Sequence, residues 1–90
     1  MSASDLVAKY IKNTGQVLQE IKTPTEEEVI LKREKILEIV EHARNYFEDA
    51  KYNRDHKKFE VALTSVSYCE GLLDALRLLG VSEFEWPTVK

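Results

Sequence analysis

The residues best placed to do chemistry lie in one apolar stretch, Tyr68-Cys69-Glu70-Gly71-Leu72-Leu73-Asp74-Ala75-Leu76. Glu70 and Asp74 are four residues apart, so a helix would carry both carboxylates on neighbouring turns. Clustered carboxylate oxygens are what a hard cation needs, so this pair would suit a small nucleotide- or metal-handling enzyme. Gly71 leaves room for a ligand or another backbone to approach. We therefore take Tyr68, Glu70, Gly71 and Asp74 as the candidate functional patch.

The same residues also fit a purely structural role. Glu70 or Asp74 can pair with Arg77 on the next turn, and Gly71 can serve close helix packing. Glycine inside a helix costs about 1 kcal/mol relative to alanine, and nothing in the local sequence offsets that cost. We hypothesise that the first helix, or the equivalent helix of a partner chain, crosses at Gly71. Tyr68 points away from the apolar stripe, so it does not obviously converge with the two acids.

Other catalytic and metal-binding patterns are absent or misplaced. Glu38 and His42 are four residues apart, whereas a carboxylate–histidine di-metal site uses Glu-x-x-His. Glu38 and Glu41 have the Glu-x-x-Glu spacing of helical pyrophosphohydrolases, but Glu70 and Asp74 lack the matching spacing. The single cysteine has no partner for an internal disulfide, and no Cys/His cluster has zinc-site spacing. We predict no catalytic residue, no metal site and no cofactor. The sequence thus favours a non-enzymatic protein over an enzyme and leaves the question open.

The segment from Tyr68 to Leu76 also carries a family resemblance. With Ala43-(x)2-Tyr46-(x)2-Asp49-Ala50-Lys51-Tyr52 and Ala62-Leu63, it resembles the archaeal family called "domain of unknown function 357". The resemblance covers roughly residues 25–81, and Cys69 stands where members have a small alanine. The family has no established activity, so the resemblance assigns no catalytic residue. Some members carry the domain beside a nucleotidyltransferase-like domain, which this chain lacks. This implies an accessory or assembly role.

Helical periodicity of the apolar residues predicts three helices, over about 4–21, 24–53 and 56–79. Ser4 is the expected N-cap of the first helix. Thr23, Pro24 and Glu26 fit an N-cap, N1 and N3 for the second. Gly80 suits the left-handed position after the third helix, where Val81 can pack back on its last turn.

The short polar break at 53–56 predicts that the second and third helices form an antiparallel hairpin. The fold class we expect is all-α, a three-helix bundle built on this long hairpin. Residues 1–90 would form a single helical domain with a C-terminal tail over 81–90. Cys69 should be buried and unreactive. The residues predicted to be buried in the hairpin are Val40, Ala43, Phe47, Leu63, Val66 and Leu73.

Composition narrows the class of protein. The 90 residues are 43% hydrophobic and 32% charged, with a formal net charge of −3, which argues against a general nucleic-acid binder. A local basic patch is still possible at the hairpin turn, and it leaves an RNA-associated helper as a third hypothesis. That patch comprises Lys51, Arg54, His56, Lys57 and Lys58. The N-terminus has no signal-peptide pattern, and no run approaches the ~20 apolar residues of a membrane span. We expect a cytoplasmic protein.

The leading hypothesis is a protein-interaction or assembly module that forms a homodimer. The second helix has apolar residues on two faces, and such a surface usually meets two neighbours. Phe84 and Trp86 in the tail are large apolar groups that can dock on the chain's own bundle or on another chain, and they form the candidate interface. We expect a homodimer that buries part of the first helix or the Phe84/Trp86 tail. The alternatives are the enzyme centred on Glu70 and Asp74, and the RNA-associated helper.

Overall fold

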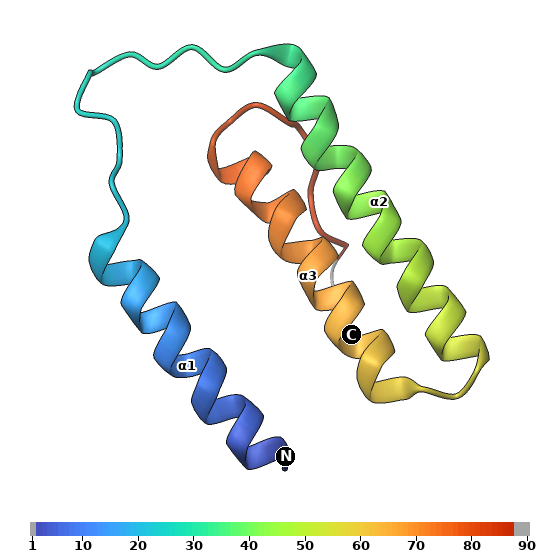
Figure 1. Ribbon diagram of the computed structural model, residues 1–90. Helices are drawn as coiled ribbons and strands as arrows, with labels where there is room; N and C mark the ends of the chain where they lie inside the picture. The colour runs from blue at the N-terminus through green and yellow to red at the C-terminus, as the bar shows by residue number, and fades with distance from the viewer. Residues whose placement is uncertain (1, 88–90) are drawn as a thin grey trace.

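The computed structural model describes residues 2–87, and within that range it contains three α-helices and no strand. Helix α1 spans Ala3–Glu20, α2 spans Arg33–Asp55 and α3 spans Phe59–Leu78 (Figure 1). None of them is long and apolar enough to cross a membrane. The all-α class with three helices, expected from the sequence, is confirmed. Met1 and residues 88–90, the end of the expected tail, lie outside the described residues.

Helices α2 and α3 form the expected antiparallel hairpin (Figure 1). The residues between the two helix axes are mostly small, so the backbones can approach closely. Tyr46 of α2 and Tyr68 of α3 also stack across one side, with ring centroids 4.3 Å apart. This pair of helices holds the whole buried core of the described chain, which comprises Ala43, Ala50, Ala62, Cys69 and Leu76.

Several residues predicted to be buried are not. Phe47 is 46% exposed and Leu63 is 66% exposed, and Val40, Val66 and Leu73 are only half-buried. The prediction of burial was wrong for Phe47 and Leu63 because two helices cover only the residues directly between them. Side chains that flank the seam need a third element on top of them. Ala43 and Cys69 are buried as expected.

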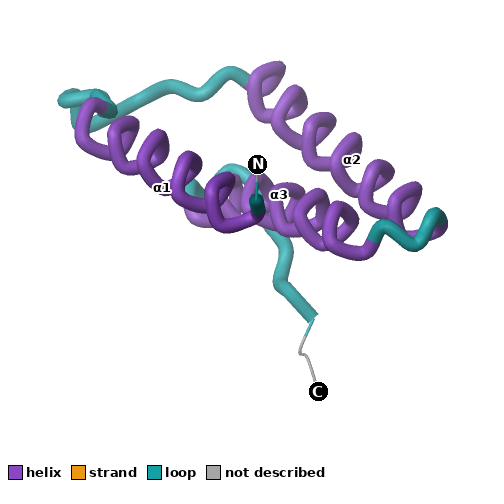
Figure 2. Tube along the Cα trace, turned by 60° about the horizontal axis from the view of Figure 1, so that its bottom comes forward, coloured by secondary structure: helices purple, strands orange, loops and turns teal. Residues whose placement is uncertain are grey.

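Helix α1 supplies no such third layer, because it packs on neither α2 nor α3 (Figures 1 and 2). None of its residues is buried, although its apolar side chains follow one broad stripe along the helix. The radius of gyration is 16.1 Å, whereas a compact chain of this length has about 12 Å. The exposed apolar residues of α1 and the residue after it are Leu6, Val7, Tyr10, Ile11, Val17, Leu18 and Ile21.

The second helix begins nine residues later than predicted, at Arg33 instead of about residue 24. Residues 21–32 form an irregular connection that runs between α1 and α2 (Figure 2). No neighbour covers the apolar side chains that follow the three glutamates at 26–28. Ile30, for example, is 92% exposed. A helix without tertiary packing is marginal, so propensity alone does not extend α2 to Pro24.

The ends of the helices differ in part from the predictions. Ser2, not Ser4, caps α1 in a capping box, with the Asp5 N–H donating to Ser2 Oγ at 3.1 Å. At the hairpin turn, Lys57 takes the left-handed conformation, with φ of 61°. The end of α3 is as predicted. Gly80 has φ of 76°, and the Val81 N–H donates to the Leu76 carbonyl at 3.2 Å.

Candidate functional site

Asp74 is held in place by two neighbours. Arg77 Nε and Nη2 donate to Asp74 Oδ1 at 3.0 and 2.9 Å, as the (i, i+3) spacing allows. Trp86 Nε1, from the tail, donates to the same oxygen at 3.1 Å. The hydrogen bond from Trp86, followed by that from Arg77, lowers the pKa of the Asp74 carboxyl. Asp74 is therefore ionised at neutral pH, and its Oδ1 already accepts three hydrogen bonds.

The tail brings the candidate patch and the candidate interface together. It returns along the outer flank of α3, where Trp86 joins Ser67, Glu70, Gly71 and Asp74 around a shallow depression of about 330 Å³. The Phe84 ring meets the Trp86 ring edge-on, with centroids 5.0 Å apart. The Asp74 carboxylate is the main polar group of this depression, and it already holds Trp86. We therefore interpret the depression as the docking point for residues 81–87.

Two expectations about the patch need correction. Tyr68 does not join the other three residues, because it stacks on Tyr46 on the opposite flank of α3. The first helix of the same chain does not cross at Gly71, since a Cβ atom there would find nothing within 4 Å. The helical spacing already indicated the position of Tyr68. Spacing along one helix could not show whether α1 would reach Gly71.

Metal binding has no cluster to support it in the part of the chain that the structure describes. No three His, Cys, Asp or Glu side chains gather there closely enough to hold a metal ion. Glu70 is exposed. Within the described residues, the geometry therefore adds no support to the enzyme hypothesis, which rests on the spacing of Glu70 and Asp74.

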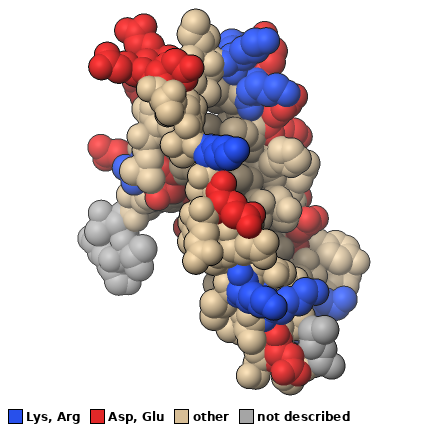
Figure 3. Space-filling model, turned by 60° about the vertical axis from the view of Figure 1, so that its left-hand side comes forward, with Lys and Arg blue, Asp and Glu red and all other residues tan. Residues whose placement is uncertain are grey.

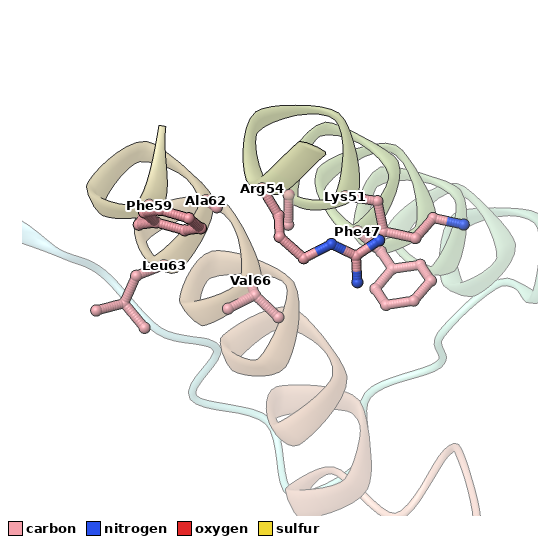
Figure 4. Close-up of a pocket in the computed structure, with 8 residues that line it drawn as sticks. Phe47, Lys51, Arg54, Phe59, Ala62, Leu63 and Val66 are labelled. Carbon is pink, nitrogen blue, oxygen red and sulfur yellow. The ribbon is translucent and has the colours of Figure 1, made fainter. Parts of the chain in front are cut away.

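A second site lies closer to the hairpin turn, where the side chains that α1 leaves uncovered form a groove. Phe59, Leu63 and Val66 line it from α3, and Phe47, Lys51 and Arg54 line it from α2 (Figure 4). Ala50 and Ala62 lie at its floor, and its volume is about 330 Å³. We call these eight residues the seam groove. It is predominantly apolar, and its cations come from α2.

The seam groove continues along the hairpin. Phe47 also lines a neighbouring hollow of about 270 Å³ with Val40, Arg44, Leu73 and two residues of the core. The apolar surface therefore runs without a break from the hairpin turn towards the start of α2. Lys51 Nζ lies 5.0 Å from the centre of the Phe47 ring, and it also pairs with Glu48 at 3.1 Å. The result is a long apolar strip with a basic edge.

Sequence reasoning missed this groove because it assigned Phe47 and Leu63 to the interior. The signal was present in the width of the apolar surface, which exceeds what one neighbour can cover. The basic turn borders a hollow of its own, of about 420 Å³, which is lined by Lys57, Lys58, Phe59, Glu60 and Val61. Lys51 and Arg54 pair with Glu48 and Asp55. In Figure 3 several basic side chains lie side by side in the lower half of the molecule, with acidic side chains below them.

A family model described as "Protein of unknown function (DUF357)" matches residues 9–82 of the chain. The match extends the resemblance found at 25–81 into the first helix, and it spans most of α1, the connection, the hairpin and the cap at Gly80. No curated protein and no solved structure matches the chain.

Proposed function

Because the chain belongs to the DUF357 family of proteins of unknown function, we propose its role from its own geometry: a non-enzymatic protein-interaction module that assembles by pairing with a second copy of itself. The family match includes α1 as well as the hairpin. A proposed role must therefore account for both α1 and the hairpin.

The observation that carries this proposal is the area that the single chain leaves exposed. Its accessible surface is 8389 Å², whereas a compact monomer of 10.4 kDa exposes roughly 5400 Å². The surplus is about 3000 Å², and a standard protein–protein interface buries about 800 Å² on each partner. Much of the surplus is apolar, on α1 and along the seam groove. Such a surface is typical of a protein that has a partner.

The charges favour a protein partner over a membrane surface or a nucleic acid. Helices that lie on membranes carry an excess of Lys and Arg on the polar face. The polar face of α1 is balanced instead, with Lys9 and Lys12 against Asp5 and Glu20. The whole chain has a net charge of −3. A reducing cytoplasm is the compartment we propose, because the single cysteine is buried and forms no disulfide.

Sedimentation equilibrium from low to high micromolar concentration tests the proposal. We expect a reversible monomer–dimer equilibrium, with the dimer at twice 10.4 kDa. Leu18→Asp places a charge on the exposed apolar stripe of α1 and should shift the equilibrium to monomer. Gln16→Asp places the same charge on the polar face of α1 and should leave it unchanged. A wild-type protein that stays monomeric at high micromolar concentration would refute the proposal.

A further inference from the structure

We infer that the seam groove of each hairpin takes up α1 of the second copy, so that the dimer forms by reciprocal exchange of α1. This inference rests on the proposed self-association and names the surfaces that meet. The seam groove lacks a covering helix, and α1 lacks a surface to cover. One chain thus presents both halves of a contact that it does not make with itself. Exchange of an identical element between protomers is a low-cost route to a dimer.

The dimensions of the two surfaces match. At 1.5 Å per residue, the apolar stripe of α1 from Val7 to Leu18 is about 17 Å long. The apolar strip along α2 from Val40 to Arg54 is about 21 Å long by the same measure. Apolar side chains line the strip along its length, from Phe59 and Leu63 to Leu73. An amphipathic helix whose apolar face lies in a hydrophobic groove is a recurring mode of protein recognition.

The charges indicate how α1 lies in the groove. Four of the eight Lys and Arg residues in 33–78 lie at the turn, namely Lys51, Arg54, Lys57 and Lys58. Lys51 and Arg54 pair with Glu48 and Asp55, whereas no ion pair of the described chain involves Lys57 or Lys58. An acidic run at 26–28 follows α1. These charges come together if the C-terminal end of α1 points towards the hairpin turn. Helix α1 then runs parallel to α2.

That direction favours the second copy over the same chain. To place its own α1 this way, the chain would have to return along all 23 residues of α2, about 34 Å. The connection over 21–32 has twelve residues and reaches about 40 Å only when fully extended. The connection contains bends as well as Pro24, so it is not fully extended. A second copy can supply α1 without stretching the connection to its limit.

A complementation experiment on the full-length chain tests the exchange. Leu18→Asp disables α1 and leaves the seam groove intact, while Leu63→Asp disables the groove and leaves α1 intact. Both side chains are exposed in the single chain, so both variants should retain the hairpin, as checked by circular dichroism. Each variant alone should be monomeric, because neither copy can complete a contact. An equimolar mixture should regain dimer, since the intact α1 of one variant fits the intact groove of the other.

Matched controls and opposing outcomes make the test decisive. Gln16→Asp on α1 and Thr64→Asp, which neighbours Leu63 but lies off the groove, should dimerise like the wild type. If Leu63→Asp alone still dimerises, α1 does not use the groove and the inference is wrong. If wild type dimerises but the mixture stays monomeric, α1 folds back within each chain and exchange is also wrong. Either result leaves the proposed self-association standing, whereas a monomeric wild type refutes that proposal itself.

Discussion

Asp74 illustrates how one side chain can be diverted from chemistry to structure. The carboxylate spacing suggested a reactive site, but the Trp86 indole and the Arg77 guanidinium both donate to Asp74 Oδ1. These hydrogen bonds favour the charged form and lower the pKa of the Asp74 carboxyl. The lowered pKa makes Asp74 a poor proton donor at neutral pH and a good anchor for the tail.

The anchoring predicts how tail docking depends on pH. A lowered native pKa means that the interaction is fully present above the ordinary pKa of aspartate. It is lost as the pH falls through the native value. We expect the fluorescence of Trp86, the only tryptophan, to shift to the red in that acidic range. Asp74→Ala should show the red-shifted emission at neutral pH.

Glu70→Ala is the matched control, because Glu70 borders the same depression and makes no hydrogen bond to the tail within the described chain. Its emission at neutral pH should equal that of the wild type. If Asp74→Ala also keeps the wild-type emission at neutral pH, Asp74 does not hold the tail.

Cys69 should be slow to react in the folded protein. Burial, followed by the nearby Glu70 carboxylate, raises the pKa of the Cys69 thiol, so little thiolate forms at neutral pH. A thiol reagent should label Cys69 much faster in denaturant than in the native state. A cysteine at the exposed position of Ala75, made as Ala75→Cys in a Cys69→Ala background, should react quickly in both. Fast native labelling of Cys69 would contradict its burial.

The hairpin turn stores backbone strain at Lys57. A residue with a Cβ atom in the left-handed region costs roughly 1–2 kcal/mol, and Lys57 has φ of 61°. Lys57→Gly should therefore stabilise the protein by about 1 kcal/mol, measured as the free energy of unfolding in urea. Lys58 has φ of −94°, so Lys58→Gly should be neutral or slightly destabilising. Equal effects of the two substitutions would argue against strain at Lys57.

Substitutions at Gly71 test whether another element covers α3 at that position. Because a Cβ atom would meet nothing within 4 Å, Gly71→Ala should stabilise α3 by about 1 kcal/mol through helix propensity. Gly71→Val should then be close to neutral or slightly stabilising, since the β-branched side chain gains less propensity. Chemical denaturation at low protein concentration measures both. Destabilisation by valine, typically 1–3 kcal/mol for overpacking, would indicate that a partner chain crosses there after all.

The molecule as a whole consists of a packed hairpin and helix α1, whose stability depends on contacts that the hairpin does not provide. An isolated helix of 18 residues is marginal in water, and α1 makes no tertiary contact with α2 or α3. Its order should therefore be linked to assembly, as binding stabilises whatever conformation it selects. The hairpin has its own core and should not share this dependence.

We therefore expect the helix content to fall on dilution. The far-ultraviolet circular dichroism signal per residue should decrease as the dimer dissociates, by an amount approaching the 18 residues of α1. Leu18→Asp should show the lower signal at every concentration, and Gln16→Asp should follow the wild type. A signal that does not change while sedimentation shows dissociation would mean that α1 is stable on its own.

The sequence by itself determined the features that depend on neighbouring residues. The apolar periodicity, the short polar break and the Gly80 signal predicted the hairpin and the end of α3, because helix period and capping act within a few residues. The same local reasoning identified Cys69 as buried, and it placed Glu70, Gly71 and Asp74 on one flank.

Only the tertiary structure decided what covers each face. Phe47 and Leu63 have the spacing of core residues, yet they are exposed because α1 does not pack on the hairpin. For the same reason, the capping signal at Thr23 and Pro24 did not start α2, which begins at Arg33. Burial is a property of elements that meet in space. A periodic pattern shows that a face needs a partner and leaves open which partner arrives.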